Sequence, residues 1–252
     1  HIVTGAVSAA QNIVKCVRRC GLEVNDLVLQ PLSSSYAVLS EDEKDLGVCL
    51  IDIGGGTTDL AVWTQGAIRH TSVIPIAGDQ VTNDIAMALR TPTREAEDIK
   101  CKYGCALAQL ADPAASMEVA GVDDRPSRKL SRRALADVIQ PRVEELYELI
   151  QNELRRAGFE EVLSSGIVLT GGASVMPGMV ELGEEIFHMP VRLGSPKYTG
   201  SLADVVQCPR FSTAFGLLLE AQAQRKRGQK IKEKQNVKDV FDGMKSWFAK
   251  NF

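Results

Sequence analysis

Histidines, aromatic residues and long apolar runs are scarce in this sequence, and each scarcity excludes a class of protein. Aromatic residues make up 5% of the 252 residues. No apolar run approaches the about 20 residues that a membrane-spanning helix needs. The three histidines stand far apart, whereas zinc sites usually combine histidines with closely spaced cysteine pairs. We therefore interpret the six cysteines as reduced thiols of a cytosolic protein.

The beginning of the chain lacks a targeting signal. It starts with His1 rather than Met, and the segment HIVTGAV has neither the basic stretch nor the apolar core of a signal peptide. We expect the chain to be truncated or processed at its N-terminus.

The composition and the apolar pattern predict an α/β fold. Hydrophobic residues make up 44% of the chain and charged residues 24%, as in a folded protein with a buried core. Strands alternating with helices indicate an α/β sheet, and a hairpin among the strands indicates a mixed one. Short apolar segments predict strands at 26–30, 46–53, 59–63, 68–76 and 167–170. Helical patterns occupy 31–40, 81–89, 93–103 and 132–157.

The segment DIGGGTTD, residues 52–59, interrupts the strand pattern with three consecutive glycines. Without Cβ atoms, successive N–H groups can form a concave site for anionic oxygens, to which threonine hydroxyls add donors. Asp52 could hold Mg²⁺ through water, because hard cations near phosphates prefer oxygen ligands. A glycine-rich bulge without a ligand is the alternative. The residues predicted to bind phosphate are Gly54, Gly55, Gly56, Thr57 and Thr58.

A second glycine motif, LTGGAS at 169–174, ends a predicted strand just before a helical pattern. Amides at such a junction, and the positive end of the helix dipole, can face a nucleotide. An ordinary turn between a strand and a helix would have the same pattern. We predict that Gly171, Gly172 and Ala173 lie against the nucleoside.

Two polar features supply further candidate contacts. Glu97 and Lys100 have i,i+3 spacing on a predicted helix, so they share one face and could contact the ribose or the base. A solvated salt bridge is the alternative for this pair. Gln30 lies between a predicted strand and a predicted helix, where its amide could orient a water molecule in catalysis.

The end of the chain has the pattern of a helix that lies in a membrane interface. Apolar residues of 236–252 recur with helical spacing on one face, and lysines and aspartates lie away from it. The polar, basic segment 223–235 predicts a flexible linker that anionic lipid attracts. Packing onto the protein's own core, or into a partner's groove, is the alternative. The residues predicted to enter the membrane are Val237, Val240, Phe241, Met244, Trp247 and Phe248.

In chain order these motifs resemble those of the actin/Hsp70/sugar-kinase ATPase superfamily. QPLSSSYAVL and STAFGLLLEA are similar to its two connecting helices, IDIGGGTTDL to its second phosphate hairpin, TREAEDIK to its ribose-contacting helix and IVLTGGASVMPGM to its adenosine loop. The resemblance implies an actin-like fold, with RNase H-like mixed sheets flanked by helices, that binds ATP with Mg²⁺. It also implies that this chain lacks the first phosphate loop and carries only part of the N-terminal lobe.

The basic linker and terminal amphipathic helix make the chain similar, within this superfamily, to the FtsA family. That resemblance implies a scaffold that tethers FtsZ filaments to the cytoplasmic face of the bacterial inner membrane at the division site. It implies self-association into filaments, contacts with other division proteins and at most a weak ATPase rather than a metabolic enzyme. A PilM-type scaffold of pilus assembly and a small-molecule kinase of the superfamily are the alternatives.

The family's domain order implies the boundaries. Residues 1–21 form the end of subdomain 1C, and 22–44 are the returning part of 1A. Subdomain 2A covers 45–91 and 159–222, with 2B inserted at 92–158.

The 2B subdomain of the family receives the acidic, apolar C-terminal peptide of FtsZ. The cluster RPSRKLSRR lies in this insertion, so Arg125, Arg132 and Arg133 could pair with the peptide's carboxylates. A solvated loop and helix start is the alternative. We do not predict nucleic-acid binding, because stacking aromatic residues do not interleave with the cluster.

Overall fold

The computed structural model describes residues 1–121 and 126–227. Arg125 and the predicted membrane helix at 236–252 therefore lie outside the described residues, as does most of the predicted linker. The chain divides into one compact unit of residues 1–2 and 28–219 and a second of residues 3–27 and 220–252.

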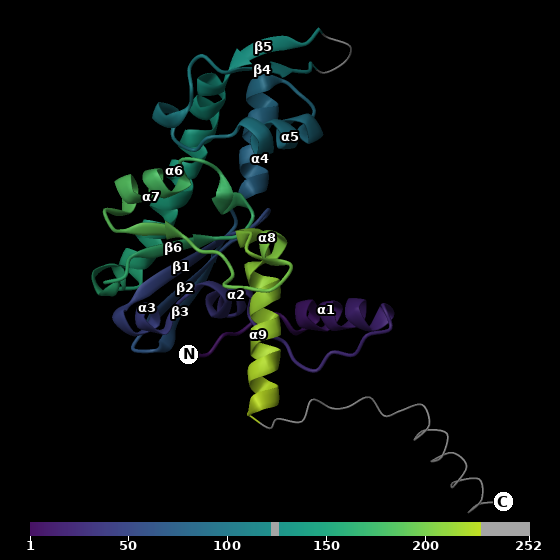
Figure 1. Ribbon diagram of the computed structural model, residues 1–252, viewed down its shortest axis with the longest axis vertical. Helices are drawn as coiled ribbons and strands as arrows, with labels where there is room; N and C mark the ends of the chain where they lie inside the picture. The colour runs from purple at the N-terminus through teal and green to yellow at the C-terminus, as the bar shows by residue number, and fades with distance from the viewer. Residues whose placement is uncertain (122–125, 228–252) are drawn as a thin grey trace, which may run out of the picture. The chain divides into compact units, whose positions relative to one another are not determined.

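The larger unit is built on a five-stranded mixed sheet with the order β3-β2-β1-β6-β7 (Figure 1). β1, β2 and β3 form an antiparallel meander, whereas β6 pairs parallel to β1 and β7 parallel to β6. The predicted strands at 46–53, 59–63, 68–76 and 167–170 are confirmed, as is the mixed sheet. The strands are β1 (Val48–Ile53), β2 (Thr58–Thr64), β3 (Ala67–Ile74), β6 (Ile167–Thr170) and β7 (Val191–Leu193).

Helices flank this sheet, and a small two-stranded ribbon is separate from it. β4 (Ser116–Val119) and β5 (Arg128–Ser131) pair antiparallel as a separate two-stranded sheet. The predicted helices at 81–89, 93–103 and 132–157 are confirmed. The helices are α1 (Val7–Arg19), α2 (Gln30–Val38), α3 (Glu41–Leu46), α4 (Gly78–Leu89), α5 (Thr93–Tyr103), α6 (Arg132–Arg156), α7 (Met179–Phe187), α8 (Ala203–Val206) and α9 (Ser212–Lys226). Short 3₁₀ turns occupy Ala108–Leu110, Glu160–Val162, Ala173–Val175 and Pro209–Phe211.

The two faces of the sheet bury two separate apolar cores. Along β1, Cys49, Ile51 and Ile53 point into a core shared with α4, α6 and α7. Val48 and Leu50 point the other way, into a core shared with α2. Side chains alternate between the faces of a strand, so both cores follow from one continuous apolar sequence. The next residue of the α2-facing series is Asp52, so the strand pattern itself carries a carboxylate to that face.

Two segments differ from the prediction. The strand predicted at 26–30 is wrong, because residues 26–29 are irregular and α2 already begins at Gln30. Leu27 and Leu29 are exposed by 51% and 41%, and within the described residues the segment has no strand partner that would bury them. α9 continues to Lys226, so the first residues of the predicted flexible linker are helical. Alanine, glutamine, arginine and lysine there are good helix formers.

Candidate functional site

The glycine hairpin between β1 and β2 is fastened to the first turn of α4. Within the hairpin, the amide of Gly54 donates to the carbonyl oxygen of Thr57 over 3.0 Å. The carbonyl oxygens of Gly54 and Gly55 then accept hydrogen bonds from the amides of Gly78 (3.1 Å) and Asp79 (2.8 Å). Thr58 Oγ1 also donates to the carbonyl oxygen of Ile76 over 2.7 Å. The first amides of α4 therefore hold the hairpin in place and do not themselves face a ligand.

The hairpin leaves main-chain donors open. The residues from Gly55 to Thr57 are exposed, and within the described part of the chain their amides make no hydrogen bond. The left-handed conformation that favours glycine occurs at Gly171 but not at the hairpin glycines, all of which are described. Glycine at these positions matters for space: a Cβ on Gly55 would lie 3.3 Å from Asp79 Oδ1. Open amides without covering side chains are the geometry that phosphate binding requires.

Two buried carboxylates face each other behind the hairpin. Asp52 of β1 and Asp59 of β2 are directly paired, with only 3% and 7% of their surfaces exposed. No lysine or arginine forms an ion pair with either carboxylate in residues 1–121 and 126–227. Burial raises the pKa of Asp59, and the charge of Asp52 raises it further. Asp59 was missed in the sequence, although it flanks the glycines and threonines symmetrically with Asp52.

The carboxylate pair fits a divalent cation held largely by water and phosphate. Buried like charges without a basic partner are costly, and a cation would relieve that cost. In the described ranges no group of three or more His, Cys, Asp or Glu side chains is placed to hold a metal by itself. Mg²⁺ usually takes one or two protein carboxylates and keeps several waters or substrate phosphates, which is compatible with such a pair.

The TGGA turn, residues 170–173, closes directly on this pair. Gly171 has a left-handed φ of 90°, and a Cβ there would lie 2.4 Å from the carbonyl oxygen of Ile53 and 2.5 Å from Asp52 Oδ1. Only glycine allows this approach, so the turn and the hairpin form one site. The expected helix directly after the turn is wrong. A 3₁₀ turn at Ala173–Val175 intervenes, and α7 starts at Met179, after Gly178 with a left-handed φ of 86°.

The predicted pair of Glu97 and Lys100 is present on α5. Lys100 Nζ lies 2.7 Å from Glu97 Oε2 and also donates to the carbonyl oxygen of Gly78 (3.0 Å) and to Thr82 Oγ1 (2.8 Å). These bonds use all three donors of the ammonium group. Burial raises the pKa of Glu97, but hydrogen bonds from Lys100 and Thr82 outweigh it and bring the pKa below its usual value. Lys100 joins α5 to the start of α4, and a contact with ribose stays a prediction.

Gln30 is the first residue of α2 and not the end of a strand. It is exposed, and within the described residues its side chain makes no hydrogen bond. Its role in orienting water therefore stays a prediction.

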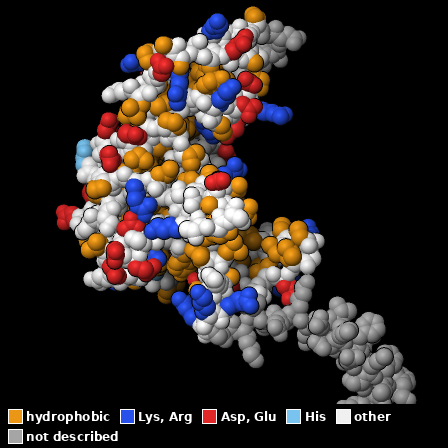
Figure 2. All heavy atoms as spheres, viewed as in Figure 1, with side chains coloured by type: hydrophobic (Ala, Val, Ile, Leu, Met, Phe, Trp, Pro, Cys, Tyr) orange, Lys and Arg blue, Asp and Glu red, His pale blue; other side chains and the backbone are white. Residues whose placement is uncertain are grey.

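The basic cluster has two kinds of arginine. Arg132 Nε donates to the carbonyl oxygen of Tyr103 over 2.9 Å and caps the end of α5, while Arg128 donates to the carbonyl oxygen of Leu89 at the end of α4. Arg133 is exposed. Figure 2 shows basic and acidic side chains interspersed over this part of the chain. Partner binding by these arginines stays a prediction, for which Arg133 has the freer side chain.

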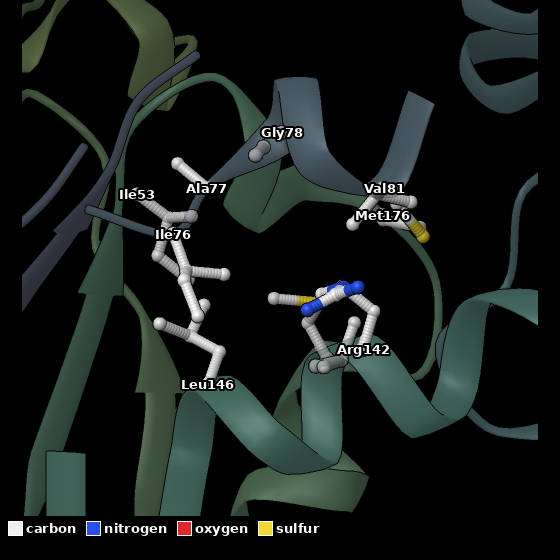
Figure 3. A pocket seen from close by; sticks show the side chains of 11 residues that line it. Ile53, Ile76, Ala77, Gly78, Val81, Arg142, Leu146 and Met176 are labelled. Atoms are coloured by element: carbon white, nitrogen blue, oxygen red, sulfur yellow. The ribbon is translucent and has the colours of Figure 1, made fainter. Parts of the chain in front are cut away.

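A small apolar chamber lies between α4 and α6, on the face of β1 opposite to Asp52 (Figure 3). It has an empty volume of about 310 Å³, including its opening to solvent. Ile53, Gly78 and Ala173 line it, so the hairpin, the start of α4 and the TGGA turn share one apolar backing. Arg142 of α6 also lines it, with its guanidinium bonded to Asp84 over 2.5 and 3.1 Å. Because the guanidinium of Arg142 is already paired with Asp84, we expect an anionic ligand to bind to the open amides of the hairpin rather than to this arginine.

Comparison with solved structures places the fold. MreB5 of Spiroplasma citri bound to ADP matches with a TM-score of 0.72 at 19% identity, over 90% of this chain and 69% of that one. A PilM–PilN type IV pilus biogenesis complex matches with a TM-score of 0.65 at 21% identity, over 84% and 57% of the two chains. At these identities the similarity shows the actin-like fold alone.

Comparison of sequences is more specific. The family model for cell division protein FtsA matches residues 49–216. The chain is 58% identical to FtsA of Pseudomonas aeruginosa and 46% identical to FtsA of Escherichia coli, in both cases over the whole of this chain. It spans 62% of the length of each of these relatives. The predicted resemblance is thereby confirmed: the chain belongs to the FtsA family of actin-like cell division proteins.

Proposed function

We propose that this chain is part of an ATP-binding scaffold that tethers FtsZ filaments to the inner membrane and helps to assemble the division machinery. The observation that carries the nucleotide part is the meeting of the open hairpin amides, the Asp52–Asp59 pair and the TGGA turn at one end of the sheet. Ligands of open α/β sheets bind at such strand ends.

In this proposal the amides of Gly55, Gly56 and Thr57 hold the phosphates. Mg²⁺, when bound, neutralises phosphate charge, and Asp52 with Asp59 holds it through water. Gly172 and Ala173 contact the nucleoside, while Glu97 contacts ribose from α5. Turnover of ATP is at most weak. Gln30 orients the attacking water, and no base for a second substrate is proposed.

Nucleotide binding can be tested by titrating ATP with Mg²⁺ in a calorimeter. Gly55→Val covers the amides and should weaken binding by about tenfold or more, because a lost set of charge-assisted hydrogen bonds is worth over ~1.4 kcal/mol. Gly5→Val is the matched control, since a Cβ at Gly5 meets nothing within 4 Å. Equal affinity of both variants and the wild type would refute the phosphate role.

The membrane part of the proposal rests on the sequence of 236–252. No helix in the described part of the chain is both long and apolar enough to cross a bilayer. Several apolar side chains of one copy, at about 1.5–3 kcal/mol each before ordering costs, give reversible binding, which many copies on a filament would strengthen. One filament-forming relative by fold is MamK, solved as a double helical filament with a TM-score of 0.64.

Liposome flotation tests the tether. The intact chain should float with vesicles that contain anionic lipid, and a chain ending at Gln235 should not. Trp247→Ser, on the predicted apolar face, should reduce flotation, whereas Asp242→Ser, off that face, should not. Flotation that survives the deletion would reject the tether.

The alternatives are less well supported. The PilM similarity reaches only 21% identity, whereas the FtsA relatives match the entire chain. A small-molecule kinase would need a base facing an acceptor hydroxyl, and it has no use for a membrane helix.

A further inference from the structure

Three consecutive buried serines in α2 have three different partners. Ser33 Oγ donates to the main-chain carbonyl oxygen of Thr213 over 2.8 Å. Ser34 Oγ donates to Asp52 Oδ2 over 2.5 Å. Ser35 Oγ donates to the carbonyl oxygen of Pro31 over 2.7 Å. All three are fully buried, and only Ser34 among them bonds to a residue of the carboxylate pair.

A second hydroxyl reaches the same carboxylate oxygen from the first turn of α9. Thr213 Oγ1 lies 3.2 Å from Asp52 Oδ2 and 2.9 Å from Ser34 Oγ. Each hydroxyl has one proton, and Ser34 uses its proton on Asp52. Thr213 therefore donates to Asp52 directly or to Ser34, and either arrangement directs both protons toward the carboxylate.

The two hydroxyls cannot easily move away, because α2 and α9 touch closely here. A Cβ on Gly216 would lie 1.8 Å from the carbonyl oxygen of Ser33. The main chains of the two helices are therefore in direct contact next to Thr213. This contact holds the donors at a fixed distance from Asp52.

Both donors engage Oδ2, which leaves Oδ1 for another ligand. Oδ1 lies on the other side of the carboxylate, against Gly171 of the TGGA turn. Among the described residues, Oδ1 receives no hydrogen bond. Every fully buried side-chain oxygen of these residues does have a hydrogen-bond partner, so Oδ1 is not fully buried. Oδ1 therefore keeps access to solvent, on the side of the site where the hairpin and the turn meet.

We propose that Ser34 and Thr213 are positioning residues for a divalent cation: they fix Asp52 through Oδ2 so that Oδ1 is presented to the cation or its water. The inference rests on the cation site of the proposed function, but not on nucleotide binding. Hydroxyl partners of a metal-holding carboxylate fix its orientation, and losing such a partner typically lowers metal affinity about 10- to 100-fold.

Mn²⁺ binding to the purified full chain, followed by electron paramagnetic resonance with and without ADP, tests this inference. Ser34→Ala and Thr213→Val should each weaken Mn²⁺ binding by about tenfold. Thr213→Ser keeps the donor and should retain wild-type affinity. Ser35→Ala is the matched control, because it removes an equally buried hydroxyl of the same helix that bonds to the carbonyl oxygen of Pro31 and to the indole of Trp63, and to neither Asp52 nor Thr213.

The outcomes separate this inference from the proposed function. Folded Ser34→Ala and Thr213→Val variants with wild-type Mn²⁺ affinity would overturn the inference alone, as would an equal loss in Ser35→Ala. Absence of Mn²⁺ binding in the wild type would overturn both the cation site and the inference. Mn²⁺ binding with the expected variant pattern but without ADP binding would support the inference and reject nucleotide binding. If Ser34→Ala fails to fold, the comparison of Thr213→Val with Thr213→Ser decides.

Discussion

Asp52 and Asp59 lie directly opposite each other on β1 and β2, and both carboxylates are buried without a basic partner in the described residues. This arrangement costs stability in the absence of a cation, since like charges in a buried site repel each other. The cost is confined to the end of the sheet where the glycine hairpin and the TGGA turn meet. The repulsion should be measurable as a dependence of the free energy of unfolding on pH.

Asp59→Asn should therefore stabilise the cation-free protein at neutral pH. The pKa of Asp59 is raised above its ordinary value of 3.8 in the folded state, so folding favours the protonated form. Stability is then lost as pH rises through the interval above 3.8, and the variant avoids this loss. Urea unfolding at a series of pH values should show a gain at neutral pH that vanishes in acid.

Asp137→Asn, an exposed carboxylate on α6, is the control for the change of net charge. A gain of the same size in Asp137→Asn, or a gain in Asp59→Asn that does not depend on pH, would contradict the repulsion.

Gly171→Ala should destabilise the fold by about 2–3 kcal/mol, because the left-handed backbone is strained for alanine and its Cβ would collide with the carbonyl oxygen of Ile53. Gly172→Ala is the neighbouring control. Gly172 has a φ of −66°, and its Cβ would meet only the Cβ of Arg210 at 3.6 Å, so alanine fits there. Thermal unfolding of both variants checks this, and equal effects would mean that the turn does not close on β1 as described.

Lys100→Met should lower stability by about 1–3 kcal/mol, because it removes the ammonium group that donates to the carbonyl oxygen of Gly78 and pairs with the carboxylate of Glu97. Lys102→Met removes an exposed lysine of the same helix and should change stability by less than about 0.5 kcal/mol. Chemical denaturation measures both. Unchanged stability of Lys100→Met would show that Lys100 does not join α5 to α4.

Arg132 and Arg133 are adjacent but should behave differently. Arg132→Ala should cost about 1–2 kcal/mol, because the guanidinium caps the carbonyl end of α5. Arg133→Ala should leave stability unchanged and weaken binding of the acidic FtsZ peptide in a fluorescence-anisotropy titration. If folded Arg132→Ala bound the peptide more weakly and Arg133→Ala bound it as well as the wild type, this assignment would be reversed.

Much of the fold could be predicted from local sequence. Three of its signals involve only residues close together in the chain. They are the apolar runs around the glycines, the 3.6-residue period of α6 and the Gly104 that ends α5. The i,i+3 spacing likewise placed Glu97 beside Lys100. The prediction of a strand at 26–30 was wrong because an apolar run becomes a strand only when a partner strand accepts its hydrogen bonds.

The sequence by itself determined the hairpin, most of the strands and helices around it and the residues that leave main-chain amides uncovered, since these depend on neighbours along the chain. Only the tertiary structure decided which polar groups meet. It placed Thr213 beside Asp52, which stands 161 residues away, and it set Gly171 apart from Gly172, because only the first packs against β1. Such contacts depend on how distant elements pack, and neither their spacing nor their composition encodes that packing locally.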